Sequence, residues 1–153
     1  MARPRSKQPE LFGSPSEATP DWVTAYIDGG ARGNPGPAGY GIVITDSAGT
    51  TLAELSQFLG HRTNNYAEYS ALIAALEWAL AQGHRNLRIA SDSELLVRQM
   101  KGIYKVKSLD LRPLYEQARS LSRKLERFEI AHVRREKNRR ADKLANQAMD
   151  AGR

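Results

Sequence analysis

The acidic residues whose placement could support catalysis are Asp28, Glu68, Asp92 and Asp142. Asp28 ends a run of β-forming residues, and Asp92 directly follows another such run. Glu68 and Asp142 fall in the first turns of two expected helices, on apolar stripes where an unpaired charge is costly to bury. Ligand sites of open α/β sheets lie beyond the carboxyl ends of the strands. The four side chains are therefore expected to converge there.

Converging carboxylates repel one another unless cations lie between them. Oxygen ligands without thiol or imidazole groups favour Mg²⁺ or Mn²⁺ over zinc, and two such ions about 3.5–4 Å apart support in-line phosphodiester chemistry. Each residue also has a structural explanation that the sequence leaves open. Asp28 could be a strand-to-turn residue, Asp92 a helix cap, Glu68 the end of a capping box over residues 65–68, and Asp142 a complement to a helix dipole.

The elements that must position these residues follow from hydrophobic periodicity and turn signals. Strands are expected at residues 22–28, 40–45, 51–59, 86–91 and 128–133, and helices at 64–82, 93–101, 111–127 and 139–151. A glycine-dense turn is expected over residues 29–41. The order βββαβααβα predicts an α/β fold with a mixed five-stranded sheet. In it, a three-stranded antiparallel meander is joined by two parallel strands, and helices cover both faces.

Composition and charge limit the classes of protein. The 153 residues suit one domain, expected over residues 21–151 after a disordered tail at residues 1–20. The absence of cysteine excludes thiolate zinc sites, disulfides and a cysteine nucleophile. No apolar run is long enough for a secretory signal or a membrane span, which predicts a cytoplasmic protein with no membrane contact. Nothing in the sequence demands more than a monomer, and nothing implies an obligate protein partner.

The formal net charge of +6 is unevenly distributed. Residues 1–100 hold 8 basic and 10 acidic side chains, and residues 101–153 hold 15 and 7. A basic C-terminal third suggests an acidic partner, most often nucleic acid.

Four ordered blocks of sequence resemble type 1 ribonuclease H over residues 22–150. The blocks are residues 26–30 (YIDGG) with 33–41 (GNPGPAGYG), 63–65 (TNN) ahead of Glu68, 91–93 (SDS), and Asn138 with 141–142 (AD). The resemblance implies that the four carboxylates bind two ions of Mg²⁺ or Mn²⁺. It also implies an endonuclease that cuts the RNA strand of an RNA/DNA hybrid, leaving 5′-phosphate and 3′-hydroxyl ends.

The flanking motifs suit recognition of that substrate. Gly33 and Asn34 can approach a ribose and its 2′-hydroxyl, and Asn64 and Asn65 stand at a helix start that can meet a phosphate or base edges. Turn and capping chemistry is the alternative explanation for both pairs. The resemblance adds three more residues to the predicted substrate-binding set: Gly29, Ser91 and Asn138.

The loop before Asp142 departs from the family pattern. Many members carry a histidine there, but this loop is shorter and His132 is expected inside the preceding strand. Arg135 is predicted instead to contact the scissile phosphate or the departing product. It cannot act as a base because a guanidinium stays protonated. A surface arginine is the open alternative.

The segment after the Asp92 helix is the second departure. Several members insert a basic protrusion here, whereas residues 102–109 form only a short connection, which resembles the compact members. Tyr104 is predicted to stack on a sugar, and Lys105 and Lys107 to neutralise phosphates. Fewer phosphate contacts predict weaker, salt-sensitive binding.

Two further functions remain open at this point. One is a non-catalytic protein that binds RNA/DNA hybrids or double-stranded RNA on the same fold. The presence of all four carboxylates disfavours it. The other is a DNA-cutting, integrase-like relative, which would not need the motifs at residues 33–36 and 64–65.

Overall fold

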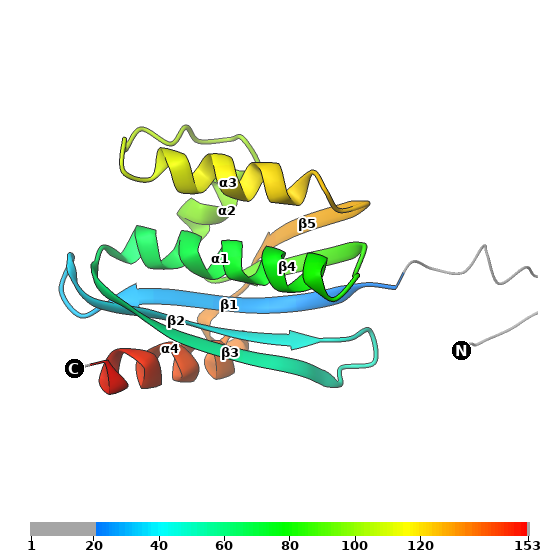
Figure 1. Cartoon of the computed structure of the whole chain (residues 1–153), viewed down its shortest axis with the longest axis horizontal. Helices are drawn as coiled ribbons and strands as arrows, with labels where there is room; N and C mark the ends of the chain where they lie inside the picture. Colours follow the sequence, from blue (N-terminus) through cyan, green and yellow to red (C-terminus); the bar gives the residue numbers. More distant parts are fainter. Residues whose placement is uncertain (1–20, 153) are drawn as a thin grey trace, which may run out of the picture.

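The computed structural model describes residues 21–152, and the tail predicted at residues 1–20 lies outside them. Figure 1 shows one mixed sheet between two helical layers. The strands are β1 (Val23–Ala31), β2 (Gly36–Thr45), β3 (Thr51–Arg62), β4 (Asn86–Ser91) and β5 (Arg127–His132). The helices are α1 (Asn64–Ala81), α2 (Glu94–Met100), α3 (Arg112–Ser122) and α4 (Arg139–Ala151), with a short 3₁₀ turn, η2 (Arg135–Lys137), before α4.

The sheet order is β3-β2-β1-β4-β5. β1 pairs antiparallel with β2, and β2 pairs antiparallel with β3. β4 lies parallel to β1 and β5 parallel to β4. Apart from η2, the element order is the one expected, so the predicted mixed sheet of a meander and two parallel strands is confirmed.

Several predicted boundaries were wrong, most clearly the glycine-dense turn. β1 continues to Ala31 and β2 begins at Gly36, so only residues 32–35 connect them. The strand glycines are needed for close packing rather than for turning, as the site below explains. α3 is also shorter than predicted because residues 123–126 turn the chain, and the N–H groups of Glu126 and Arg127 donate to the Arg85 carbonyl at 2.9 and 3.1 Å.

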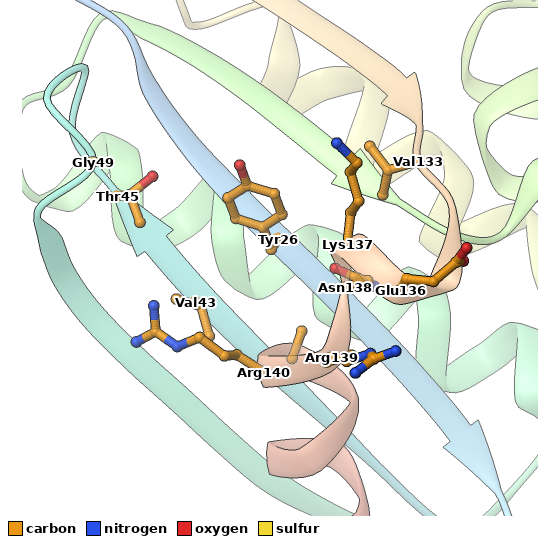
Figure 2. A pocket seen from close by; sticks show the side chains of 11 residues that line it. Tyr26, Val43, Thr45, Gly49, Val133, Glu136, Lys137, Asn138, Arg139 and Arg140 are labelled. Carbon is orange, nitrogen blue, oxygen red and sulfur yellow. The ribbon is translucent and has the colours of Figure 1, made fainter.

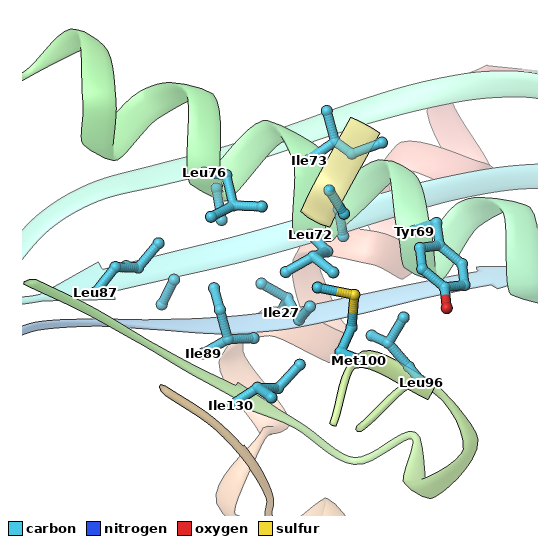
Figure 3. Packing of buried hydrophobic residues seen from close by; sticks show 14 of the residues in the cluster. Ile27, Tyr69, Leu72, Ile73, Leu76, Leu87, Ile89, Leu96, Met100 and Ile130 are labelled. Carbon is cyan, nitrogen blue, oxygen red and sulfur yellow. The ribbon is translucent and has the colours of Figure 1, made fainter. Parts of the chain in front are cut away.

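Helices cover both faces of the sheet, as predicted. α1, α2 and α3 lie on one side and α4 on the other (Figure 1). The main core lies between the sheet and α1, where Leu72 and Leu76 pack toward Ile27 and Ile89 (Figure 3). These four side chains are at most 1% exposed, so they anchor α1 firmly over β1 and β4. None of the helices in residues 21–152 has the length and apolar character needed to cross a bilayer.

Candidate active site

Four different elements supply the four carboxylates. Asp28 lies in β1, Glu68 in α1, Asp92 directly after β4 and Asp142 in the first turn of α4. Ile27 pairs with Ser91 in the parallel ladder, so Asp28 within β1 lies beside Asp92, which directly follows β4. The structure thereby brings together the residues that the sequence analysis grouped.

Two glycines let the helices approach Asp28. Gly29 follows Asp28, and a Cβ there would lie 2.4 Å from the backbone of Ala67 in α1. Gly41 pairs with Asp28 across the β1–β2 ladder, and a Cβ there would lie 2.3 Å from the Ala141 carbonyl oxygen in α4. Real side chains never pack that closely. These glycines therefore allow α1 and α4 to bring Glu68 and Asp142 against the two faces of β1.

The structure removes most of the simple structural explanations for the carboxylates. The α1 N-cap is Thr63, which accepts from the Tyr66 N–H, so Glu68 is not the end of a capping box over residues 65–68. The α2 N-cap is Ser93 rather than Asp92. Asp28 lies within β1 rather than at its end. Only Asp142 keeps a position that complements a helix dipole.

The electrostatic state of Asp28 reflects this crowding. Burial, followed by the charge of Asp92, a side-chain hydrogen bond with Asp142 and the charges of Asp142 and Glu68, raises the pKa of Asp28 to about 8. The pKa of Glu68 rises to about 7, mainly by burial and further by the Asp92 charge, against the lowering effect of a hydrogen bond from Ser93. Without a cation, the cluster therefore retains protons at neutral pH.

Ser93 is a site residue that the sequence analysis missed. Its Oγ–H donates to Glu68 Oε1 at 3.1 Å, and the same Oγ accepts the Leu96 N–H at 3.2 Å as the α2 N-cap. Ser93 thereby orients the Glu68 carboxylate. A serine one residue after Asp92 at a helix start was the available signal, but only the fold shows that it faces α1.

The chemistry of the cluster suits a divalent cation. All four candidate ligands are carboxylates, which are the ligands that hard cations prefer, and their mutual repulsion would be relieved by positive charge. In residues 21–152, no three histidine, cysteine, aspartate or glutamate side chains are already arranged to hold an ion. Binding at this cluster would therefore require its carboxylate side chains to rearrange.

Comparisons with known proteins point to one family. A model of the Reverse transcriptase-like family matches residues 26–148. Ribonuclease HI of Halobacterium salinarum is 43% identical over 145 residues, which is 90% of this chain and 73% of that protein. The solved structure of LC11-RNase H1 in complex with RNA/DNA hybrid superposes with a TM-score of 0.81 at 46% identity, covering 85% of this chain and 98% of that one. This chain belongs to the type 1 ribonuclease H family.

One relative is longer than this chain and matches it over only part of the relative's length. Bifunctional protein Rv2228c of Mycobacterium tuberculosis is 50% identical over 130 residues, which is 84% of this chain but 36% of that protein. Its N-terminal RNase H domain, solved as a fusion with maltose binding protein, superposes with a TM-score of 0.82 at 48% identity, covering 85% of this chain and 94% of that one. The chain thus spans about a third of this relative.

The asparagines in the two predicted recognition motifs of this chain contact one another. Asn34 Oδ1 accepts the Asn64 N–H at 3.0 Å, and Asn64 Oδ1 accepts the Ala31 N–H at 2.7 Å. Asn34 and Asn65 also line a surface groove of about 570 Å³. Gly33 has a φ of +91°, a conformation that favours glycine at this exposed turn.

Two of the predicted substrate residues are buried. Ser91 is 3% exposed and accepts the Ser93 N–H on its Oγ at 3.0 Å. Asn138 is 1% exposed and donates from Nδ2 to the Ile27 carbonyl at 2.8 Å. Substrate binding by Ser91 and Asn138 stays a prediction, but both side chains are committed to contacts inside the fold. They fix the backbone beside Asp92 and Asp28.

A pocket of about 530 Å³ lies beside the start of α4, on the sheet face that carries Tyr26 (Figure 2). Asn138 lines it, and Asn138 Oδ1 has no hydrogen-bond partner within residues 21–152. Arg139 and Arg140 point apart in Figure 2, and Arg140 pairs with Glu54 at 2.7 Å. These two arginines therefore do not converge on the pocket.

The two departures from the family pattern differ in their placement. Arg135 lies in η2, and its Nε is 3.8 Å from Asp92 Oδ2 while its side chain is 86% exposed. His132 ends β5, as expected. Tyr104, Lys105 and Lys107 are exposed on the loop between α2 and α3, and Arg98 stacks over the Tyr104 ring at 5.4 Å. Arg135 thus borders the carboxylates, and the loop residues are open to solvent.

Proposed function

We propose that this chain is an endonuclease that hydrolyses the RNA strand of RNA/DNA hybrids, using two ions of Mg²⁺ or Mn²⁺ and leaving 5′-phosphate and 3′-hydroxyl ends. The observation that carries the proposal is the meeting of Asp28 with Glu68, Asp92 and Asp142, which the β1–β4 pairing and the close approach of α1 and α4 at Gly29 and Gly41 bring together. Membership of the ribonuclease H family and a relative solved with an RNA/DNA hybrid support the choice of substrate.

Each part of the site has a distinct task in this proposal. Asp28, Glu68, Asp92 and Asp142 hold the cations, and Ser93 keeps the Glu68 carboxylate turned toward them. Divalent ions bound there supply Lewis acidity, which lowers the pKa of an attacking water and stabilises the leaving oxygen.

Recognition residues surround the carboxylates. The Arg135 guanidinium contacts the scissile phosphate or the departing product. The turn of residues 32–35 and the start of α1 read the ribose, with Asn34, Asn64 and Asn65 supplying polar groups. Tyr104, Lys105 and Lys107 contact the backbone farther along the hybrid.

The wider organisation is part of the proposal. We infer that residues 21–151 act as one catalytic domain and work as a monomer. A cysteine-free composition fits a reducing cytoplasm, which is the location we propose.

Labelled substrates test the proposal. The full chain is incubated with RNA/DNA hybrid, RNA duplex, DNA duplex and single strands, each with Mg²⁺, Mn²⁺ or EDTA. The expected result is metal-dependent cleavage confined to the RNA of the hybrid. The products should ligate without prior phosphorylation, because they carry 5′-phosphate and 3′-hydroxyl ends. Binding of the hybrid without cleavage would favour a non-catalytic binding protein, and cleavage of DNA duplex would favour an integrase-like activity.

A further inference from the structure

The turn of residues 32–35 follows β1 and contacts α1 and α4, and each of these three elements carries a candidate metal ligand. Figure 1 shows this turn, the start of α1 and the C-terminal end of α4 at the same end of the sheet. Its backbone is closed by the Arg32 N–H, which donates to the Pro37 carbonyl at 2.9 Å. Gly33, Asn34 and Pro35 are exposed, so side chains at the edges of the turn must hold it in place.

Arg32 binds the turn to α4. Its guanidinium donates from Nη1 to Asp150 Oδ1 and from Nη2 to Asn146 Oδ1, the second bond at 3.0 Å. Asn146 Nδ2 donates in turn to the Asp142 carbonyl at 3.0 Å. A chain of hydrogen bonds therefore connects Arg32 to the helical turn that carries Asp142.

Asparagines bind the opposite side of the turn to α1. Asn34 Oδ1 accepts the Asn64 N–H at 3.0 Å, and Asn64 Oδ1 accepts the Ala31 N–H at 2.7 Å. Glu68 follows Asn64 by about one helical turn. The turn is thus attached to both helices that flank Asp28.

We propose that Arg32 is a positioning residue that holds the turn of residues 32–35 against α4, and that this ordering raises selectivity for RNA/DNA hybrid over DNA duplex. The inference rests on the proposed function. A turn ordered before binding loses less conformational entropy when it meets the ribose. DNA duplex lacks the 2′-hydroxyl, so its binding gains nothing from an ordered turn.

The ion pair is suited to positioning rather than to stability. The Arg32 and Asp150 side chains are 41% and 54% exposed, and such exposed pairs add little to folding stability. The planar guanidinium reaches two acceptors one helical turn apart, which a single lysine ammonium group cannot match in geometry. Loss of Arg32 should therefore affect substrate binding more than thermal stability.

The first test replaces Arg32 with alanine. In Arg32→Ala, we expect KM for the hybrid to rise about fivefold, because the turn then loses conformational entropy when it binds substrate. We expect kcat to stay within about twofold and the Kd for DNA duplex to be unchanged, because Asp142 is still held by α4. Arg85→Ala is the matched control, since Arg85 also forms an exposed ion pair, with Glu126 at 3.0 Å. It should leave all three quantities unchanged.

Two more variants separate positioning from a direct phosphate contact. A phosphate contact predicts that Arg32→Lys restores binding and that Asp150→Ala tightens it by removing a negative charge. Positioning predicts that Arg32→Lys stays close to Arg32→Ala and that Asp150→Ala weakens hybrid binding. The double variant Arg32→Ala/Asp150→Ala should bind the hybrid no more weakly than Arg32→Ala alone.

Amide hydrogen exchange provides a readout that needs no substrate. In free Arg32→Ala, the N–H groups of Arg32 and Asn64 should exchange faster than in the wild type, because both close the turn. If the wild type cleaves hybrid, unchanged amide exchange or an unchanged KM in Arg32→Ala overturns the inference about Arg32. A wild type that leaves every hybrid intact overturns the proposed function instead.

Discussion

Around Asp28, four elements hold four acidic side chains in a partly buried cluster, whereas residues 101–111 between α2 and α3 present Tyr104, Lys105 and Lys107 to solvent. The acidic cluster depends on close packing, since glycines at positions 29 and 41 are required for the helices to reach β1. The basic loop has no such requirement. In the proposed function, the placement of reacting groups is thus built into the core of the fold, and contact with the nucleic acid backbone is assigned to an exposed connection.

The largest expected effect comes from the centre of the acidic cluster. Asp28→Asn should lower hybrid cleavage by at least about a hundredfold, because it removes a candidate ligand of the cations. The fold should survive, since like charges are relieved. Single-turnover cleavage and thermal denaturation in EDTA measure the two effects. A fully active variant would remove Asp28 from the metal site, and a large drop in Tm would mark it as structural.

Stability without metal should depend on pH in a defined direction. The pKa of Asp28 in the folded protein is about 8 and that of Glu68 about 7, both above their ordinary values of 3.8 and 4.5. The folded state therefore holds more protons than the unfolded state above about pH 4, so stability falls as pH rises from there toward 8. Melting curves in EDTA across this window should show the decline. Asp28→Asn should flatten it, and an equal slope in that variant would contradict the assignment.

Ser93 connects Glu68 of the acidic cluster to the start of α2 through its hydroxyl group. Ser93→Ala removes the hydrogen bond to Glu68 and should reduce kcat by about tenfold or more, in line with other groups that orient metal ligands. It also removes the α2 N-cap at a cost of about 1 kcal/mol. Ser93→Thr keeps a hydroxyl for both roles and is the control. Equal kcat in the alanine and threonine variants would show that Ser93 acts only as a cap.

Arg135 shares a property with each region: its side chain is highly exposed, like the loop residues, yet it lies near Asp92 of the acidic cluster. Arg135→Ala should lower turnover by about tenfold if its charge-assisted contact with phosphate is lost. Stability should not change, because the side chain is 86% exposed. An unchanged rate would make Arg135 an ordinary surface residue.

The basic loop should show the smallest effects. Lys105→Ala and Lys107→Ala should each weaken hybrid binding a few-fold and reduce the salt dependence of log Kd by about one unit, with kcat unchanged. Lys124→Ala, at the other end of α3, is the control for loss of an exposed positive charge. A large loss of kcat in either loop variant would mean that the loop and the acidic cluster act together, contrary to the comparison above.

The sequence was sufficient for the element order, which periodicity sets, and for the grouping of the four carboxylates, although Asp28 lies within β1 rather than at its predicted end. It was insufficient where a role depends on tertiary contacts. Ser91 and Asn138 look like polar motif residues, yet the fold buries their side chains. The glycines near Asp28 suggested a turn, whereas their real reason is the approach of α1 and α4. The partnership of Ser93 with Glu68 joins residues 25 positions apart and has no local signal.

The most direct test of the central claim is calorimetric titration of Mn²⁺ into metal-free protein at pH 8, comparing the wild type with Asp28→Asn. The account predicts saturable binding to the wild type and a large loss of affinity in the variant, since the carboxylates around Asp28 hold the cations. Equal affinity in the two proteins, or no binding to the wild type at millimolar Mn²⁺, would contradict it.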